Sequence, residues 1–252
     1  MFLDNLFPGY LGALAAPASF LKRLRHRNLV SFGLLANLQA MQKKSVITDI
    51  DAIIDVGANQ GQFAFMAHSI WHEIPIYSFE PDPENFVVLQ HHFSKYSIMG
   101  QALNMALGSE QTTLALHRYE NHVNNSFLTR EETNNSFQQF DKVNVTCTTL
   151  DAISASLPKI NAAFVKLDVQ GFELAVLKGS VNFLQHCRYV LAEVSFTSSY
   201  TNGAHADEVM LALRSYGFEC IQLLDILRDK KSGHILEADM LFINKQWGRN
   251  EN

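Results

Sequence analysis

The chain has 252 residues, of which 47% are hydrophobic, and a formal net charge of −5. This length suits one large domain that buries about three quarters of its unfolded surface, and the hydrophobic fraction is typical of a globular protein. The acidic balance argues against a nucleic-acid partner, which usually requires a basic face. Three widely spaced cysteines, Cys147, Cys187 and Cys220, indicate neither a disulfide framework nor a zinc site.

Residues 1–45 precede the first strand-like pattern and allow two interpretations. Residues 6–21 carry no charge, but the stretch is shorter than the roughly 20 residues that span a bilayer and contains Pro8 and Pro17. The basic cluster at residues 22–27 follows the apolar part, which is the wrong order for a signal peptide. We favour a helical cap on a main domain at 46–252 over an amphipathic segment on a membrane surface. A cytoplasmic location is expected.

The first regular pattern is a buried strand that leads into a glycine-containing turn. Residues 53–56 are typical of a parallel strand covered on both faces. Gly57 and Gly61 permit positive φ and a close approach of backbone to ligand. A helix beginning near Gln62 would direct its first N–H groups toward that ligand. The pattern predicts a cofactor cradle.

The next strand, at residues 76–79, ends in Glu80 roughly 20 positions past the glycines, where dinucleotide-type folds hold ribose hydroxyls. The turn lacks the third glycine that makes room for a pyrophosphate, and Asp55 would repel phosphate groups. S-adenosylmethionine carries a sulfonium, an ammonium and a ribose without phosphate, and therefore matches the pattern. The cofactor-binding residues predicted here are Asp55, Gly57, Ala58, Asn59, Gly61, Glu80 and Pro81.

Four motifs in this order resemble the FkbM-type S-adenosylmethionine-dependent methyltransferases: DVGANQGQF at 55–63, FEP at 79–81, TLD at 149–151 and VKLDVQGFELAVLKG at 165–179. The resemblance covers about residues 53–244. It departs from the family at Gln170, where a glutamate is usual, so a charge is missing near the presumed site.

The resemblance implies a Rossmann-like class I methyltransferase fold, with a mostly parallel seven-stranded sheet and an antiparallel final strand. It also implies O-methyl transfer to a hydroxyl of a sugar, glycan or natural product. In the methyltransferase superfamily the loop after the third strand commonly borders adenine, which makes Met105 and Ala106 further cofactor candidates.

The alternation of strands and helices from residue 53 onward also predicts a three-layer α/β fold. The expected helices cover 82–95, 172–187 and 206–218, and the later strands cover 97–107, 112–118, 142–148, 162–168, 189–192, 219–224 and 239–244. Strands 112–118 and 142–148 are expected to form a hairpin-like insertion. The polar stretch at 122–139 between them is interpreted as a substrate lid or an ordinary surface loop.

Charged residues at the ends of two predicted strands are the catalytic candidates. Asp168 lies at a carboxyl end, where open α/β sheets bind ligands, and Lys166 shares its face of the strand. Lys166 is interpreted either as a structural partner of a carboxylate or as a catalytic group. If the next strand is a neighbour, Glu193 converges with Asp168, and the two could hold a divalent cation such as Mg²⁺ or supply a base. Asp168 is the first choice and is also counted among the cofactor residues.

The sequence offers two further site candidates and two alternative functions. Tyr200 and His205 lie on a polar loop within reach of the same edge, and His205 is a minor candidate base. The rivals are an NAD-dependent oxidoreductase, against which the missing third glycine and Asp55 speak, and a binding or scaffold protein without turnover, which Gln170 would suit. A hydrolase is not supported, because no Gly-x-Ser-x-Gly elbow occurs.

Overall fold

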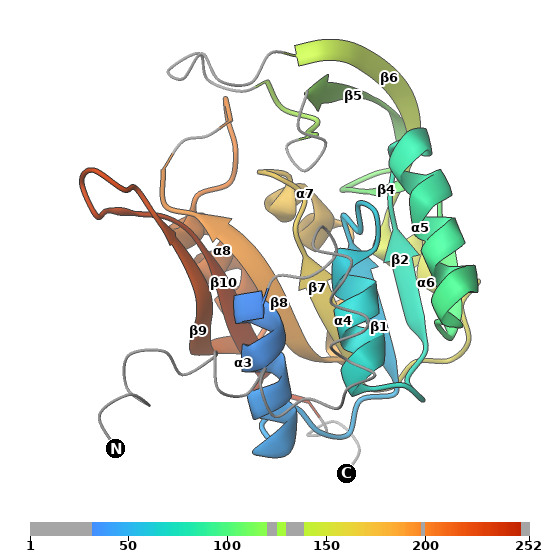
Figure 1. Cartoon of the computed structure of the whole chain (residues 1–252), viewed down its shortest axis with the longest axis vertical. Helices are drawn as coiled ribbons and strands as arrows, with labels where there is room; N and C mark the ends of the chain where they lie inside the picture. The colour runs from blue at the N-terminus through green and yellow to red at the C-terminus, as the bar shows by residue number, and fades with distance from the viewer. Residues whose placement is uncertain (1–31, 120–124, 130–138, 198–199, 248–252) are drawn as a thin grey trace.

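A computed structural model describes residues 32–119, 125–129, 139–197 and 200–247, and its main element is a seven-stranded sheet (Figure 1). The strands of this sheet are β1 (Ala52–Val56), β2 (Ile76–Phe79), β3 (Gly100–Leu103), β7 (Ala163–Leu167), β8 (Cys187–Ser195), β9 (Phe218–Arg228) and β10 (Ile235–Asn244). Their order is β3-β2-β1-β7-β8-β10-β9. Strands β3, β2, β1, β7 and β8 pair in parallel, whereas β10 runs antiparallel to β8 and β9. The predicted class I methyltransferase fold is confirmed.

Helices cover both faces of the sheet. Neighbouring residues of a strand point to opposite faces, so each strand packs against both layers of helices. Ile53 packs in a cluster with α3 (Phe32–Lys43), α4 (Gln62–Ile70) and α5 (Pro83–Tyr96). Ile54 packs on the other face with α6 (Leu150–Ser154), α7 (Glu173–Lys178) and α8 (Ala206–Ser215). Both positions are fully buried, which is why this strand reads as a continuous apolar run.

A smaller sheet lies apart from the large one, near the top of the view in Figure 1. It contains β4 (Ala106–Leu107), β5 (Thr112–Tyr119) and β6 (Gln139–Thr148) in the order β4-β6-β5. Strands β5 and β6 are antiparallel, which confirms the predicted insertion. The predicted loop at 122–139 lies mostly outside the described residues, with 125–129 as the exception.

Strands β8, β9 and β10 are longer than predicted, and two other predicted elements are interrupted in the structure. The single strand expected at 97–107 is divided between the two sheets, because the Asn104 side chain donates hydrogen bonds to the carbonyl oxygens of Glu80 and Pro81. The helix expected at 172–187 ends at Lys178 and is followed by a short 3₁₀ turn, Phe183–His186. At the next position, a Cβ on Gly179 would lie 1.9 Å from the carbonyl oxygen of Gly108, so the chain packs there as closely as a glycine allows.

Helix α3 is the described part of the predicted N-terminal cap. Its residues Leu34, Leu35 and Leu38 are buried against the main sheet, as the cap interpretation requires. Residues 1–31 lie outside the described part of the chain, so the domain boundary and the membrane-surface alternative stay predictions. Within the described residues, every helix is too short or too polar to cross a bilayer.

Candidate active site

A cavity of about 580 Å³ opens at the carboxyl ends of the central strands. Most of the predicted site residues line it, namely Gly57, Ala58, Asn59, Glu80, Pro81, Met105, Ala106, Lys166, Asp168 and Glu193. Asp55 and Gly61 are not among the lining residues. The cavity therefore joins the predicted cofactor turn to the predicted catalytic carboxyls.

The glycine turn is shaped by a close contact between strands. Gly57 has φ +78°, and a Cβ there would lie 1.9 Å from the carbonyl oxygen of Asp168. Gly61 has φ +91° and caps α4, where a Cβ would lie 2.9 Å from Leu89 Cδ1. Gly57 thus allows the ends of β1 and β7 to meet beneath the cavity, and Gly61 allows the chain to enter the helix.

The backbone donors of this turn are used within the chain. The N–H groups of Gly57 and Ala58 both donate to the Phe79 carbonyl, and that of Gly61 donates to the Ala58 carbonyl. The Asn59 N–H donates to Glu80 Oε2, and the Gln60 N–H donates to the Asn59 side chain. A phosphate-binding turn needs its N–H groups for the anion, so this turn suits a ligand without phosphate.

Glu80 lies buried on the cavity wall between the turn and α5. Its Oε2 accepts the Asn59 N–H at 2.6 Å and its Oε1 accepts the Asp82 N–H at 2.8 Å. Burial raises the pKa of Glu80 to about 8, although these two hydrogen bonds act to lower it. Each carboxylate oxygen has two lone pairs, so each can accept one further hydrogen bond from a ligand hydroxyl.

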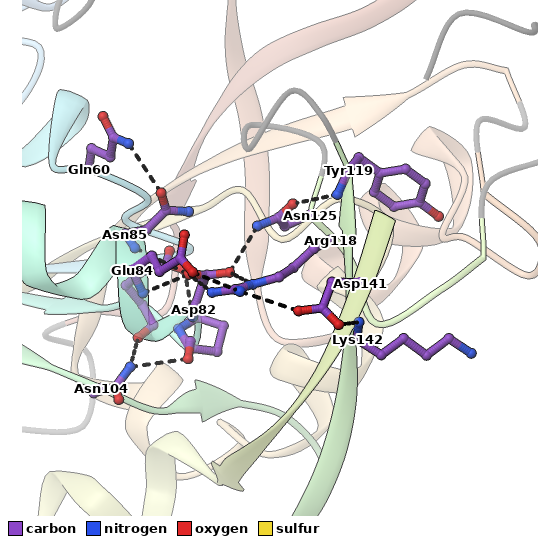
Figure 2. A network of polar contacts seen from close by, with 12 residues as sticks. Gln60, Asp82, Glu84, Asn85, Asn104, Arg118, Tyr119, Asn125, Asp141 and Lys142 are labelled. Atoms are coloured by element: carbon purple, nitrogen blue, oxygen red, sulfur yellow. Dashed lines mark hydrogen bonds and ion pairs between the residues drawn. The ribbon is translucent and has the colours of Figure 1, made fainter. Parts of the chain in front are cut away.

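Next to Glu80, a buried ion-pair network connects the small sheet to the start of α5 (Figure 2). Asp82 caps α5 by accepting the N–H groups of Glu84 and Asn85. Arg118 on β5 donates to both oxygens of Asp82, at 2.6 and 2.8 Å, and to Glu84 at 3.0 Å. The Asn125 amide also donates to Asp82, which places Asn125 on the cavity wall. Sequence reasoning missed this network, for which the capping pattern at Asp82 was the available signal.

Arg118→Met is expected to lower the free energy of unfolding by about 3–5 kcal/mol, because it leaves the buried Asp82 carboxylate without its cation. Both partners are almost fully buried, at 8% and 2% exposure. Urea unfolding measures the loss. The control is Arg228→Met on the exposed part of β9, where the guanidinium donates to the Gly233 carbonyl. Equal small losses in the two variants would contradict the structural role of Arg118.

Also on the cavity wall, Lys166 and Asp168 form a partly buried ion pair with Nζ 2.6 Å from Oδ2. Burial favours the neutral form of Lys166, but the negative charges of Asp168, Asp55, Glu193 and Asp239 outweigh it and raise the pKa of Lys166. For Asp168, burial acts to raise the pKa, and the Lys166 charge with hydrogen bonds from its neighbours lowers it overall. At neutral pH this pair is an ammonium and a carboxylate.

Glu193 on β8 is the second carboxyl at this end, because β7 and β8 are paired neighbours as expected. The charge of Asp168 and then burial hold the pKa of Glu193 well above its usual range. The Gln170 amide donates to Asp168 Oδ1 at 3.0 Å and to Glu193 Oε2 at 2.8 Å. Asp168 and Glu193, called the carboxyl pair below, therefore share the Gln170 amide as a hydrogen-bond donor, and the charge of Asp168 favours the protonated form of Glu193.

The carboxyl pair does not suit a divalent cation. The Lys166 ammonium and the Gln170 amide already donate to three of its oxygen atoms, so a cation would have to displace them. Among the residues that the structure describes, no group of three or more histidine, cysteine, aspartate or glutamate side chains could hold a metal ion.

Three other candidates are not among the residues that line the cavity. Asp55 is fully buried behind the turn, where the Ser78 hydroxyl donates to Oδ2 at 3.0 Å and Oδ1 has no hydrogen-bond partner within the described residues. Burial raises the pKa of Asp55 to about 6. Tyr200 donates its hydroxyl to the Gln170 side chain. His205 caps α8 and its N–H donates to Glu208, so it has a structural contact at the helix start.

Comparison with known proteins identifies relatives for most of the chain. A sequence model described as the methyltransferase FkbM domain matches residues 55–220. "Methyltransferase 1" of Beauveria bassiana is 29% identical over 146 residues, which are 52% of this chain and 59% of the relative. The hexuronic acid methyltransferase AglP of Haloferax volcanii is 26% identical over 144 residues, 57% and 56% of the two chains. The chain thus spans less than two thirds of the length of these curated relatives.

Comparison with solved structures also finds methyltransferases. The methyltransferase FkbM from Methylobacillus flagellatus superposes with a TM-score of 0.48 at 14% sequence identity. The superposition covers 80% of this chain and 46% of that one.

Proposed function

Because the chain belongs to the FkbM methyltransferase domain family, we propose that it transfers the methyl group of S-adenosylmethionine to a hydroxyl of a sugar, glycan or natural product. The observation that carries this proposal is one cavity that brings the phosphate-free glycine turn and Glu80 together with the carboxyl pair. A sugar acceptor is further supported by the name of the Haloferax relative, a hexuronic acid methyltransferase.

The turn end of the cavity fits the adenosine and amino-acid parts of S-adenosylmethionine. Glu80 would accept the ribose hydroxyls with its remaining lone pairs, and Met105 and Ala106 would border the adenine. Gly57, Ala58 and Asn59 line the cavity at the turn. The buried charges of Asp55 and Asp168 favour a cationic ligand.

S-adenosylmethionine supplies an activated methyl group on a sulfonium, which leaves as a neutral thioether. The chain's task is to hold the acceptor oxygen in line, and such positioning alone can lower a barrier by about 7–11 kcal/mol. As the new O–CH₃ bond forms and the S–CH₃ bond breaks, the acceptor loses its hydroxyl proton. We assign Asp168 as the base that takes this proton, with Lys166 and Glu193 holding the carboxylate in place.

The charge of the acceptor end favours an acceptor that is neutral or carries an amine. Carboxyl groups line it from four strands and the residues that follow them, at Asp168, Glu193, Asp225, Glu237 and Asp239. Among the described lining residues Lys166 is the only basic one, and it is paired with Asp168. An anionic sugar would meet carboxylates without a free cation, which costs binding energy at short range.

The acceptor class is tested with matched sugars. We expect the neutral and amino forms of a sugar to accept the methyl group at least about tenfold faster than the uronic acid, which corresponds to roughly 1.4 kcal/mol. Release of S-adenosylhomocysteine is measured with glucoside, glucosaminide and glucuronide of the same aglycone. A preference for the glucuronide would contradict the charge argument and align this chain with its Haloferax relative.

The reaction itself is tested by incubating the protein with S-adenosylmethionine carrying an isotopic label in the methyl group, together with a panel of sugars and glycosides. Mass spectrometry then locates the label. Label on a sugar oxygen supports the proposal. Label on nitrogen or carbon would contradict O-methylation, and bound S-adenosylmethionine with no transfer to any acceptor would favour a scaffold protein.

A further inference from the structure

Gln170, the position at which the chain departs from its family, occupies an unusual backbone conformation. It lies three residues after the end of β7 with φ +52°, and Gly171 continues with φ +95°. A side chain in this left-handed region costs roughly 1 kcal/mol or more relative to glycine. The cost is offset only if the side chain makes contacts that glycine could not make.

Those contacts connect the carboxyl pair to a buried tyrosine. The Gln170 amide nitrogen donates to Asp168 at 3.0 Å and to Glu193 at 2.8 Å, which uses both of its N–H groups. The amide oxygen accepts the Tyr200 hydroxyl at 2.9 Å. A flipped amide would turn its oxygen toward two carboxyl groups, so these groups select the orientation of the amide, and the Tyr200 hydroxyl supports it by donating to the amide oxygen.

The backbone of Gln170 is held as firmly as its side chain. The Ser126 hydroxyl donates to the Gln170 carbonyl at 2.7 Å and accepts the Leu128 N–H at 3.1 Å. The Ala204 N–H donates to the Gly171 carbonyl at 3.0 Å. Residues 125–129 and 200–204 thus hold Gln170 from two sides, and Ser126 is itself 1% exposed.

From these contacts we propose that Gln170 is the positioning residue of the carboxyl pair: its amide keeps Asp168 and Glu193 joined as one proton-accepting unit, with Tyr200 supporting the amide. The effect of this positioning on catalysis rests on the proposed function. An amide does this without adding charge. The glutamate usual in the family would place a third carboxyl against the pair.

The charges around the pair determine what a third carboxyl would do. Lys166 on β7 is the cation that faces it, while Asp55 on β1, Asp239 on β10 and Glu173 in the first turn of α7 add negative charge. A glutamate at 170 cannot donate a hydrogen bond when ionised, so the three carboxyls would retain an additional proton. The pair would then lose that proton, and become able to act as a base, only at a higher pH.

Three variants separate this role from a merely structural one. Gln170→Glu keeps the shape and adds a carboxyl, Gln170→Met keeps the shape without hydrogen bonds, and Tyr200→Phe removes only the hydroxyl that supports the amide. The matched control is Gln90→Glu on the exposed surface of α5. Carboxyl titration is followed by ¹³C NMR in protein labelled at aspartate and glutamate side chains, with S-adenosylhomocysteine affinity measured by calorimetry.

We expect Gln170→Glu to move the titration of the carboxyl pair upward by about one pH unit or more, and Tyr200→Phe to move it in the same direction by less. The control leaves it unchanged. With an accepted sugar, Gln170→Met and Gln170→Glu lower kcat by about tenfold or more, while KM for S-adenosylmethionine changes by less than about threefold. The pH dependence of kcat shifts with the NMR titration.

An unchanged titration in both Gln170 variants would overturn the inference, and so would a titration that shifts equally in Gln90→Glu. If Gln170→Glu fails to fold, Tyr200→Phe alone decides, since it deletes one oxygen atom. A wild-type protein that binds no adenosyl ligand but shows the expected titration shifts would refute the proposed function and leave the positioning role intact.

Discussion

Asp168→Asn is expected to slow methyl transfer by about 10²- to 10⁴-fold, because an amide cannot take the acceptor proton. Glu193 can replace part of the lost function, so we expect a loss of rate near the lower end of this range. Its pKa is raised first of all by the charge of Asp168, so the substitution lets Glu193 ionise and serve as a weaker base. Addition of Glu193→Gln is expected to remove that residual activity. Single-turnover rates at saturating S-adenosylmethionine measure both effects.

Asp229→Asn is the matched control, since Asp229 lies in the exposed turn between β9 and β10 and bonds Ser232 and Lys231. Its rate should equal that of the wild type. S-adenosylhomocysteine should bind Asp168→Asn within a few-fold of wild-type affinity, because a loss in binding would indicate a misfolded cavity. A rate unchanged in Asp168→Asn and in the double variant would exclude the carboxyl pair as the base.

Glu80→Ala is the change with the largest expected effect on cofactor binding. Leaving the buried ribose hydroxyls without an acceptor costs about 1–3 kcal/mol, so we expect the affinities for S-adenosylmethionine and S-adenosylhomocysteine to fall by roughly 10- to 100-fold. Glu80→Gln retains one acceptor oxygen and should lie between Glu80→Ala and the wild type. Calorimetry measures all three, and Glu219→Ala on exposed β9 is the control. Equal affinity in Glu80→Ala would mean that the ribose binds elsewhere.

Glu80 also gives the protein a predictable pH dependence. The pKa of Glu80 is about 8 in the folded chain, against 4.5 as its reference value, so folding favours its protonated form. The stability associated with that proton is fully present below about pH 4.5 and is lost as the pH rises through about 8. Glu80→Gln cannot ionise, and its stability relative to wild type should therefore increase between pH 5 and pH 9 in urea unfolding without ligand. A constant difference would contradict the raised pKa.

The strands that carry the site were predictable because their signals are local. β1 and β2 are short buried runs, and Gly57 and Glu80 at their ends mark the edge where ligands bind in such sheets. The same logic placed Asp168 and Glu193 on the cavity wall. The order and direction of the strands determine where these residues lie, and parallel α/β topology restricts both strongly. The positions could therefore be predicted.

The features that were predicted wrongly or missed depend on contacts between segments far apart in the sequence. The helix after Phe172 ended early because Gly179 packs on Gly108, and periodicity within the helix cannot reveal that contact. The Arg118 and Asp82 ion pair joins residues 36 positions apart, one on β5 of the small sheet and one at the start of α5. Gln170 was visible in the sequence as a departure from the family, but its bridging role needs Tyr200, which lies 30 positions later.

The most direct test of the central claim is a calorimetric titration of the wild-type protein with S-adenosylmethionine, S-adenosylhomocysteine and NAD. The turn whose N–H groups are already bonded, together with Glu80 on the wall, predicts saturable binding of both adenosyl ligands and none of NAD. Binding of NAD alone, or of no ligand, would contradict methyl transfer from S-adenosylmethionine.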